Sequence, residues 1–194
     1  SGTATITIDP TGDLPAGTAC DVGVIAASVT DLDGTADPMT SGYAWTFTTA
    51  SPTPALSIND VSQNEGNSGT TTFAFTVSLT VPAPTGGVTF DIATADGTAT
   101  TADNDYVASS LTGQTIPAGS STYTFNVTVN GDTTVEANET FVVNVTNLTG
   151  ATVADGQGQG TITNDDVALT PIHDIQGNGL ASPLDGSAVT TRGI

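Results

Sequence analysis

The feature that most constrains the fold is a period-two alternation of apolar and polar residues in the middle of the chain. Residues 73–79 read Phe-Ala-Phe-Thr-Val-Ser-Leu, and the same alternation recurs over residues 123–129 and 141–145. Successive side chains of a β-strand point to opposite faces, so each segment predicts a strand with one apolar and one polar face. The chain is rich in Thr, Val and Gly and poor in Lys, Glu and Leu, which is typical of an all-β protein.

About seven such strands are predicted in the central part of the chain, which shows no helical stretch. They cover Ala55–Val61, Thr71–Leu79, Val88–Thr94, Gly113–Ile116, Ser121–Val129, Thr140–Leu148 and Gly160–Asn164. Two packed antiparallel sheets accommodate this number of short strands. The predicted fold class is therefore an all-β, Greek-key, Ig-like β-sandwich, with partial β segments at both ends.

Composition divides the chain into four parts. Residues 1–50 contain strand patterns at Ala4–Ile8, Asp21–Ser28 and Tyr43–Thr48, and residues 51–54 read Ser-Pro-Thr-Pro, a stiff linker. Residues 55–166 form the predicted sandwich, and residues 167–194 open a further strand pattern at Val167–Ile175. Neither end segment is long enough to bury a core alone. We therefore expect the chain to be a piece of a longer polypeptide.

The charge of the chain is strongly one-sided. It has 20 Asp and Glu, one Arg, no Lys and a formal net charge of −19. Such a chain repels nucleic acid and anionic membranes, and no stretch reaches the ~18 apolar residues of a membrane span. Its natural partner is a cation. The single cysteine, Cys20, cannot form an internal disulfide and is interpreted as a small buried apolar residue.

Most of the acids of the central segment fall in four places, in loops that precede or follow predicted strands. They are Glu65; Asp96, Asp103 and Asp105; Asp132, Glu136 and Glu139; and Asp165 with Asp166. Several loops converge at one end of a Greek-key sandwich, where these carboxylates would repel one another without a cation between them. Ca²⁺ takes 6–8 oxygen ligands from loops of variable geometry, whereas Zn²⁺ prefers the His and Cys that this chain lacks. We expect Ca²⁺ here; the alternative is that these are ordinary solvated acids.

Residues 55–166 resemble a Calx-β domain. The resemblance is carried by Asn64-Glu65-Gly66-Asn67-Ser68-Gly69, Asp96-Gly97-Thr98-Ala99, Asp105-Tyr106, Ile116-Pro117-Ala118-Gly119, Glu139-Thr140-Phe141 and the run from Gly158 to Asp166. It implies that the calcium ligands are Glu65, Asp105, Asp132, Glu136, Glu139, Asp165 and Asp166, with the backbone carbonyl of Thr134. Asn164 and Gly131 stand where the family's exchanger domains carry acids, so the resemblance implies one or two ions rather than four.

The end segments carry weaker resemblances. Residues 1–50 resemble the C-terminal half of a bacterial Ig-like domain, through Leu14-Pro15-Ala16-Gly17-Thr18 and Trp45-Thr46-Phe47-Thr48-Thr49. The acids Asp31, Asp33 and Asp37 are interpreted as a turn, since no bidentate Glu follows at EF-hand spacing. The motif from Ile172 to Gly177, with Ser182-Pro183-Leu184 and Thr191-Arg192-Gly193-Ile194, resembles the region preceding the phosphodiesterase domain of bacterial extracellular nucleases.

No catalytic constellation is evident. His173 is the only imidazole, and the glycines at 156–160 precede neither a Lys nor a helix, which excludes a phosphate-binding loop. We therefore expect a non-enzymatic, calcium-binding spacer module of a secreted or cell-surface multidomain protein, whose partners are calcium ions and neighbouring domains. Two alternatives stay open: a non-catalytic part of an extracellular nuclease, and a filament or adhesin subunit that associates by strand complementation.

Overall fold

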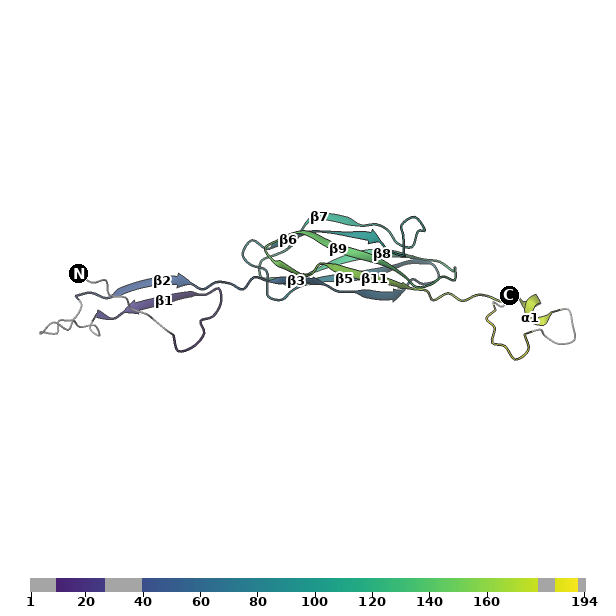
Figure 1. Ribbon diagram of the computed structural model, residues 1–194, viewed down its shortest axis with the longest axis horizontal. Helices are drawn as coiled ribbons and strands as arrows, with labels where there is room; N and C mark the ends of the chain where they lie inside the picture. The colour runs from purple at the N-terminus through teal and green to yellow at the C-terminus, as the bar shows by residue number, and fades with distance from the viewer. Residues whose placement is uncertain (1–9, 27–39, 178–183, 192–194) are drawn as a thin grey trace. The chain divides into compact units, whose positions relative to one another are not determined.

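The computed structural model describes residues 10–26, 40–177 and 184–191 (Figure 1). The chain divides into two compact units, Ser1–Thr53 and Pro54–Ile194. The predicted strand at Ala4–Ile8 and the turn containing Asp31, Asp33 and Asp37 lie outside the described residues.

The first unit contains an antiparallel pair of strands, β1 (Ala19–Val24) and β2 (Tyr43–Thr48). The second strand has the predicted bounds. The first begins two residues earlier than predicted and ends at Val24. Because paired residues of an antiparallel ladder share a face, the register gathers the apolar side chains on one side. These pairs are Cys20 with Phe47, Val22 with Trp45, and Val24 with Tyr43.

The second unit holds a β-sandwich of two sheets, as the sequence predicts (Figure 1). One sheet has the order β10-β3-β5-β8, from the strands Thr152–Asp155, Ala55–Ile58, Gly69–Leu79 and Thr122–Gly131. The other has the order β4-β11-β9-β6-β7, from the strands Val61–Asn64, Gln157–Thr163, Glu139–Thr149, Val88–Asp96 and Ser110–Ile116.

The core lies between the two sheets and is built from the apolar face of each alternating strand. Its largest fully buried side chains include five phenylalanines: Phe73, Phe75, Phe90, Phe125 and Phe141. The Phe141 ring has its centroid 5.9 Å from those of Phe73 and Phe75. Gly160 on β11 pairs with Phe141, and a side chain there would overlap this ring, so the glycine leaves the ring room beside β11. Phe141 therefore joins both sheets two residues after the acidic Glu139.

The main departure from the prediction is at residues 55–61, which form two strands in different sheets rather than one. The chain crosses at Asn59-Asp60, where side-chain oxygens replace the interrupted ladder. Asn59 Oδ1 accepts from the Thr76 N–H, and Asp60 Oδ1 accepts from the Gln159 N–H at 2.7 Å. With this split and the unpredicted short edge strand β10, the second unit has nine described strands, β3 to β11, rather than about seven.

The strand predicted at Val167–Ile175 is not formed. The described part of this segment instead contains a short helix, α1 (Ile172–Gln176). Pro171 has no N–H to give to a ladder, but its carbonyl accepts from the N–H groups of Asp174 at 2.9 Å and Ile175 at 3.1 Å. In the described residues, no helix has the length and apolarity that crossing a membrane requires.

Candidate metal centre

The strand register brings the acid-bearing segments to one end of the sandwich, here called the acidic tip. In β11, Thr163 pairs with Asn64 at the end of β4, and Ile162 pairs with Glu139 at the start of β9. In the other sheet, Gly131 at the end of β8 pairs with Gly69 at the start of β5. The acidic tip is therefore formed by the segments that carry Glu65, Asp105, Asp132, Thr134, Glu136, Glu139, Asp165 and Asp166.

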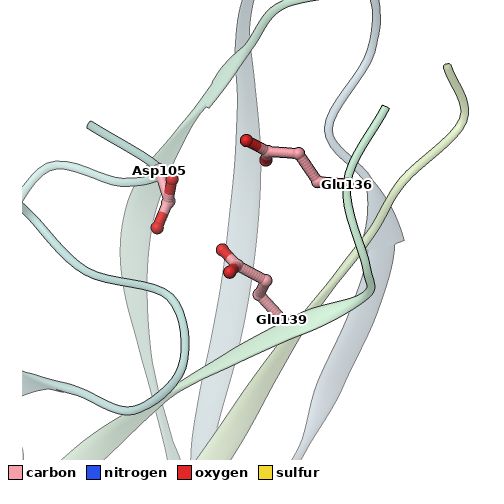
Figure 2. A group of neighbouring side chains, drawn as sticks. All are labelled: Asp105, Glu136 and Glu139. Carbon is pink, nitrogen blue, oxygen red and sulfur yellow. The ribbon is translucent and has the colours of Figure 1, made fainter. Parts of the chain in front are cut away.

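Three carboxylates of the acidic tip form its tightest described group. Asp105, Glu136 and Glu139 each offer one oxygen, and these oxygens lie within 4.8 Å of one another. Figure 2 shows their side chains turned toward a common space. They come from the loop after β6, the loop after β8 and the first position of β9. Segments that are distant in the sequence thus supply adjacent oxygen ligands.

Asp105 is held in place by both its backbone and its side chain. Its Oδ2 accepts from the Thr100 N–H at 2.7 Å, and its carbonyl accepts from the Asn130 N–H at 2.9 Å. The next residue, Tyr106, is buried and stacks on Phe141 with ring centroids 4.6 Å apart. Because Tyr106 is anchored in the core, the carboxylate beside it has little freedom to move away.

A second group of carboxylates surrounds Glu65, which follows β4 and is only 6% exposed. Its charge is repelled by Asp132, Glu136, Asp166 and Asp165. The Asp166 Oδ2 is buried and has no hydrogen-bond partner. A buried carboxylate oxygen without a donor is energetically costly, and a bound cation removes this cost.

The pKa values of the glutamates show how unfavourable the metal-free tip is. Burial, followed by repulsion from Asp132, raises the pKa of Glu65 to about 7. Burial, followed by the charge of Asp105, raises the pKa of Glu139 to about 7. Burial and the Asp132 charge also raise the pKa of Glu136. Glu136 repels both other glutamates, so the two groups form one electrostatic unit.

The residues of the acidic tip fit a calcium ion. Their donors are carboxylate and carbonyl oxygens, which Ca²⁺ prefers, and they come from loops rather than a fixed tetrahedral frame. The described residues contain no Lys or Arg. Among them, no basic side chain offsets the charges of the orphaned Asp166 oxygen and the buried Glu65, and a cation from solution would do so.

The predicted ligands differ in the hydrogen bonds that their carboxylate oxygens accept. Asp132 Oδ1 accepts from the Thr134 N–H of its own loop. Asp165 uses both oxygens in hydrogen bonds, from the Asn64 amide at 3.3 Å and the Gly66 N–H at 3.1 Å. Asp166 keeps one oxygen without a partner. The carboxylates of the site therefore differ in how many of their oxygens already accept hydrogen bonds from the protein.

Sequence reasoning left two contributors out of the ligand set. Asp103 lies close enough for its charge to raise the pKa values of Glu136 and Glu139, and its presence in the loop with Asp105 was the available signal. Gly131 contributes through its lack of a side chain. A Cβ there would collide with the backbone oxygens of Glu65 and Gly66, so this position excludes an acid for steric reasons.

Comparison with known proteins gives matches to two families and to solved structures. A model of the Calx-beta domain matches residues 57–168, and a model of a bacterial Ig-like domain matches residues 1–49. No curated protein matches the chain.

Among solved structures, CBD12 from CALX1.2 is 22% identical with a TM-score of 0.50, and covers 58% of this chain and 44% of its own. The calcium binding domain CBD12 of CALX1.1 is 21% identical with a TM-score of 0.50, and covers 60% and 50%. The apo-form Calx CBD1 domain is 18% identical with a TM-score of 0.48, and covers 59% and 100%. The chain thus spans about half the length of the two CBD12 structures, and these two similarities concern the fold.

The matched family model, which covers more than half of the chain and the whole acidic tip, shows that this chain belongs to the Calx-beta domain family.

Proposed function

We propose that this chain is a calcium-binding structural module. The observation that carries the proposal is the convergence of carboxylates from four separate segments around two features that need a cation, the buried Glu65 and the unpartnered Asp166 Oδ2. A bound calcium ion supplies the positive charge that offsets their mutual repulsion.

The ligands proposed are the side chains of Glu65, Asp105, Asp132, Glu136, Glu139, Asp165 and Asp166, with the Thr134 carbonyl. Within this set, Asp105, Glu136 and Glu139 are the group whose oxygens lie within 4.8 Å. Asp105 is fixed through Tyr106 and the core. Glu139 is fixed as the first residue of β9. The core therefore presents these two ligands, and the loop after β8 supplies Glu136 beside them.

The mechanical consequence proposed is stiffening of the chain at the end of the sandwich. Asp165 and Asp166 follow β11 directly, and the chain continues from them toward α1. Fixing these carboxylates against the loops of Glu65 and Glu136 restrains the first residues after the domain. In a multidomain protein this orients whatever follows. Calx-beta and bacterial Ig-like domains are typical of secreted and cell-surface proteins, which supports the same location for this one.

Calorimetry tests the proposal directly. Extracellular calcium modules bind with Kd of roughly 10⁻⁴–10⁻³ M, and at ten times Kd each site adds about 1.4 kcal/mol to stability. We expect titration with CaCl₂ to give a heat signal that saturates as the sites fill. The melting temperature should be higher in calcium than in EGTA. Equal melting temperatures in the two buffers, with no saturable heat, would contradict the proposal.

A second candidate, a filament or adhesin subunit, rests on the hairpin of β1 and β2. Its apolar face leaves Tyr43 66%, Trp45 39% and Phe47 40% exposed. Exposed aromatic clusters of this kind mark interaction surfaces. If the segment after the sandwich supplied the strand that completes the open edges of this hairpin, it would have to be extended; its described part contains α1, which weighs against complementation by that segment. Sedimentation of the chain at increasing concentration tests this candidate, which a monomer at all concentrations would exclude.

The nuclease alternative stays a prediction. Its motif at residues 172–194 lies partly outside the described residues, and its test is nuclease activity of the longer polypeptide.

A further inference from the structure

Side-chain amides tie several of the acidic segments together across the tip. The Asn67 amide donates to Asp166 Oδ1, and the Asn64 amide donates to Asp165 Oδ2 at 3.3 Å. A carboxylate only accepts hydrogen bonds, so the NH₂ group of each asparagine must face it. These bonds span 99 and 101 residues of sequence, and they join the end of β4 and the loop after it to the segment after β11.

A third amide connects the other loop. The Asn164 NH₂ donates to the Glu136 carbonyl at 2.8 Å, and the Asn164 N–H donates to Asn138 Oδ1 at 3.1 Å. Asn164 Oδ1 in turn accepts from the Asp166 N–H at 3.0 Å. The carboxamide of Asn164 thus uses its donor on one side and its acceptor on the other. We call Asn64, Asn67 and Asn164 the amide brace.

Of the two carboxylate oxygens of Asp166, only one accepts a hydrogen bond from the amide brace. Oδ1 is held by Asn67, whereas Oδ2 is buried without a partner. Rotation of the carboxylate toward water would satisfy Oδ2, but it would break the charge-assisted bond to Asn67. An open pocket of about 400 Å³ is lined by Asn67, Asp165 and Asp166 among others, so solvent lies beside this carboxylate. Asn67 therefore holds Asp166 in an orientation that leaves one dry oxygen available.

We propose that Asn67 is a positioning residue for the metal: by holding Asp166 Oδ1, it keeps the buried, unpartnered Asp166 Oδ2 in place at the acidic tip before a cation arrives. This inference rests on the proposed calcium-binding function and adds a residue that is not itself a ligand. The neutral Asn67 side chain then contributes to the calcium affinity, because a ligand that is already held in place loses less hydration and rotational freedom on binding.

The test is calcium titration of the full chain carrying Asn67→Ala, with Asn126→Ala as the matched control. Asn126 is exposed in the middle of β8, where it pairs with Ala74. We expect the Kd for calcium to rise about tenfold in Asn67→Ala, the size expected for losing a hydrogen bond to a charged group, and to stay unchanged in the control. Circular dichroism in EGTA verifies that each variant is folded.

Two readouts separate positioning from a general stabilising role. A merely structural bond would lower the melting temperature equally in calcium and in EGTA, whereas positioning makes the difference between the two buffers shrink. In a double-mutant cycle, Asn67→Ala should have no further effect on Kd once Asp166→Asn has removed the held carboxylate. Full additivity of the two changes, or an unchanged Kd in Asn67→Ala, would overturn the inference while leaving calcium binding intact. Absence of calcium binding in the unmodified chain would overturn both.

Discussion

Without calcium, the sandwich should become less stable as the pH rises from about 4.5 to about 7. The cause is the pKa of Glu65, which lies at 4.5 when exposed and about 7 in the folded state. A carboxyl that binds its proton more tightly in the folded state makes unfolding easier as that proton is removed. The loss begins at the unfolded pKa and is complete above the folded one. Glu139, with its pKa also raised to about 7, adds a loss in the same direction and range.

The magnitude follows from the size of the shift. Moving a pKa from 4.5 to about 7 corresponds to at most about 3.5 kcal/mol per carboxyl, at about 1.4 kcal/mol per pH unit. Water and salt screen partly exposed charges, which reduces this to about 1–2 kcal/mol each. The two glutamates together should therefore cost about 3 kcal/mol, or about 10 °C in melting temperature for a domain of this size. The lowered pKa of Asp91 has the opposite sign, but it acts only below its ordinary 3.8 and outside this range.

The assay is denaturant or thermal unfolding in EGTA at about pH 5 and about pH 8, repeated with excess calcium. Glu65→Gln removes one ionisable group, so at the higher pH the metal-free variant should exceed the unmodified chain by about 1–2 kcal/mol. Asp155→Asn, at an exposed position on β10, is the control and should change neither value. Calcium should abolish the pH dependence of the unmodified chain. A metal-free stability that stays level or rises between the two pH values would refute the reasoning.

Three further substitutions test how the core and the backbone support the acidic tip. Phe141→Ala should lower the free energy of unfolding, measured by chemical denaturation, by about 3–5 kcal/mol because its ring joins both sheets. Val135→Ala, at a 53% exposed position, is the control and should lower it by less than about 0.5 kcal/mol. Equal losses in the two variants would contradict this packing. Tyr106→Phe removes a 2.6 Å bond to Asp96 and should destabilise by about 1–2 kcal/mol, measured in the same way, with no change as the opposing result. Gly131→Asp should lower the melting temperature in EGTA without adding a calcium equivalent in calorimetry, because its Cβ collides with neighbouring backbone; an added equivalent would show that the loop yields.

The sequence predicted the strands well where alternation was long and regular. Residues 71–79 and 140–148 were expected as strands and appear in β5 and β9 with small extensions. The break at Asn59-Asp60 escaped prediction because the crossing depends on hydrogen bonds to Thr76 and Gln159, which lie far along the chain. The helix α1 escaped because its five residues are too few to show a helical period.

The sequence predicts which residues form the acidic tip better than it predicts how their side chains are arranged. Acids beside strand ends are visible in the sequence, and the strand register then gathers their segments at one end. The amide brace was not visible, because the asparagines at 64 and 67 differ from ordinary loop residues only through partners about a hundred residues away. The unequal treatment of the Asp166 oxygens likewise follows from packing, which local sequence patterns do not encode.

The most direct test of the account is the position of calcium in crystals of this chain grown or soaked in CaCl₂, located by anomalous scattering. We expect a peak at the acidic tip, about 2.3–2.6 Å from carboxylate oxygens of Asp105, Glu136 and Glu139. Crystals in millimolar calcium that show these carboxylates with water alone, or a peak elsewhere, would contradict the central claim that a divalent cation holds these segments together.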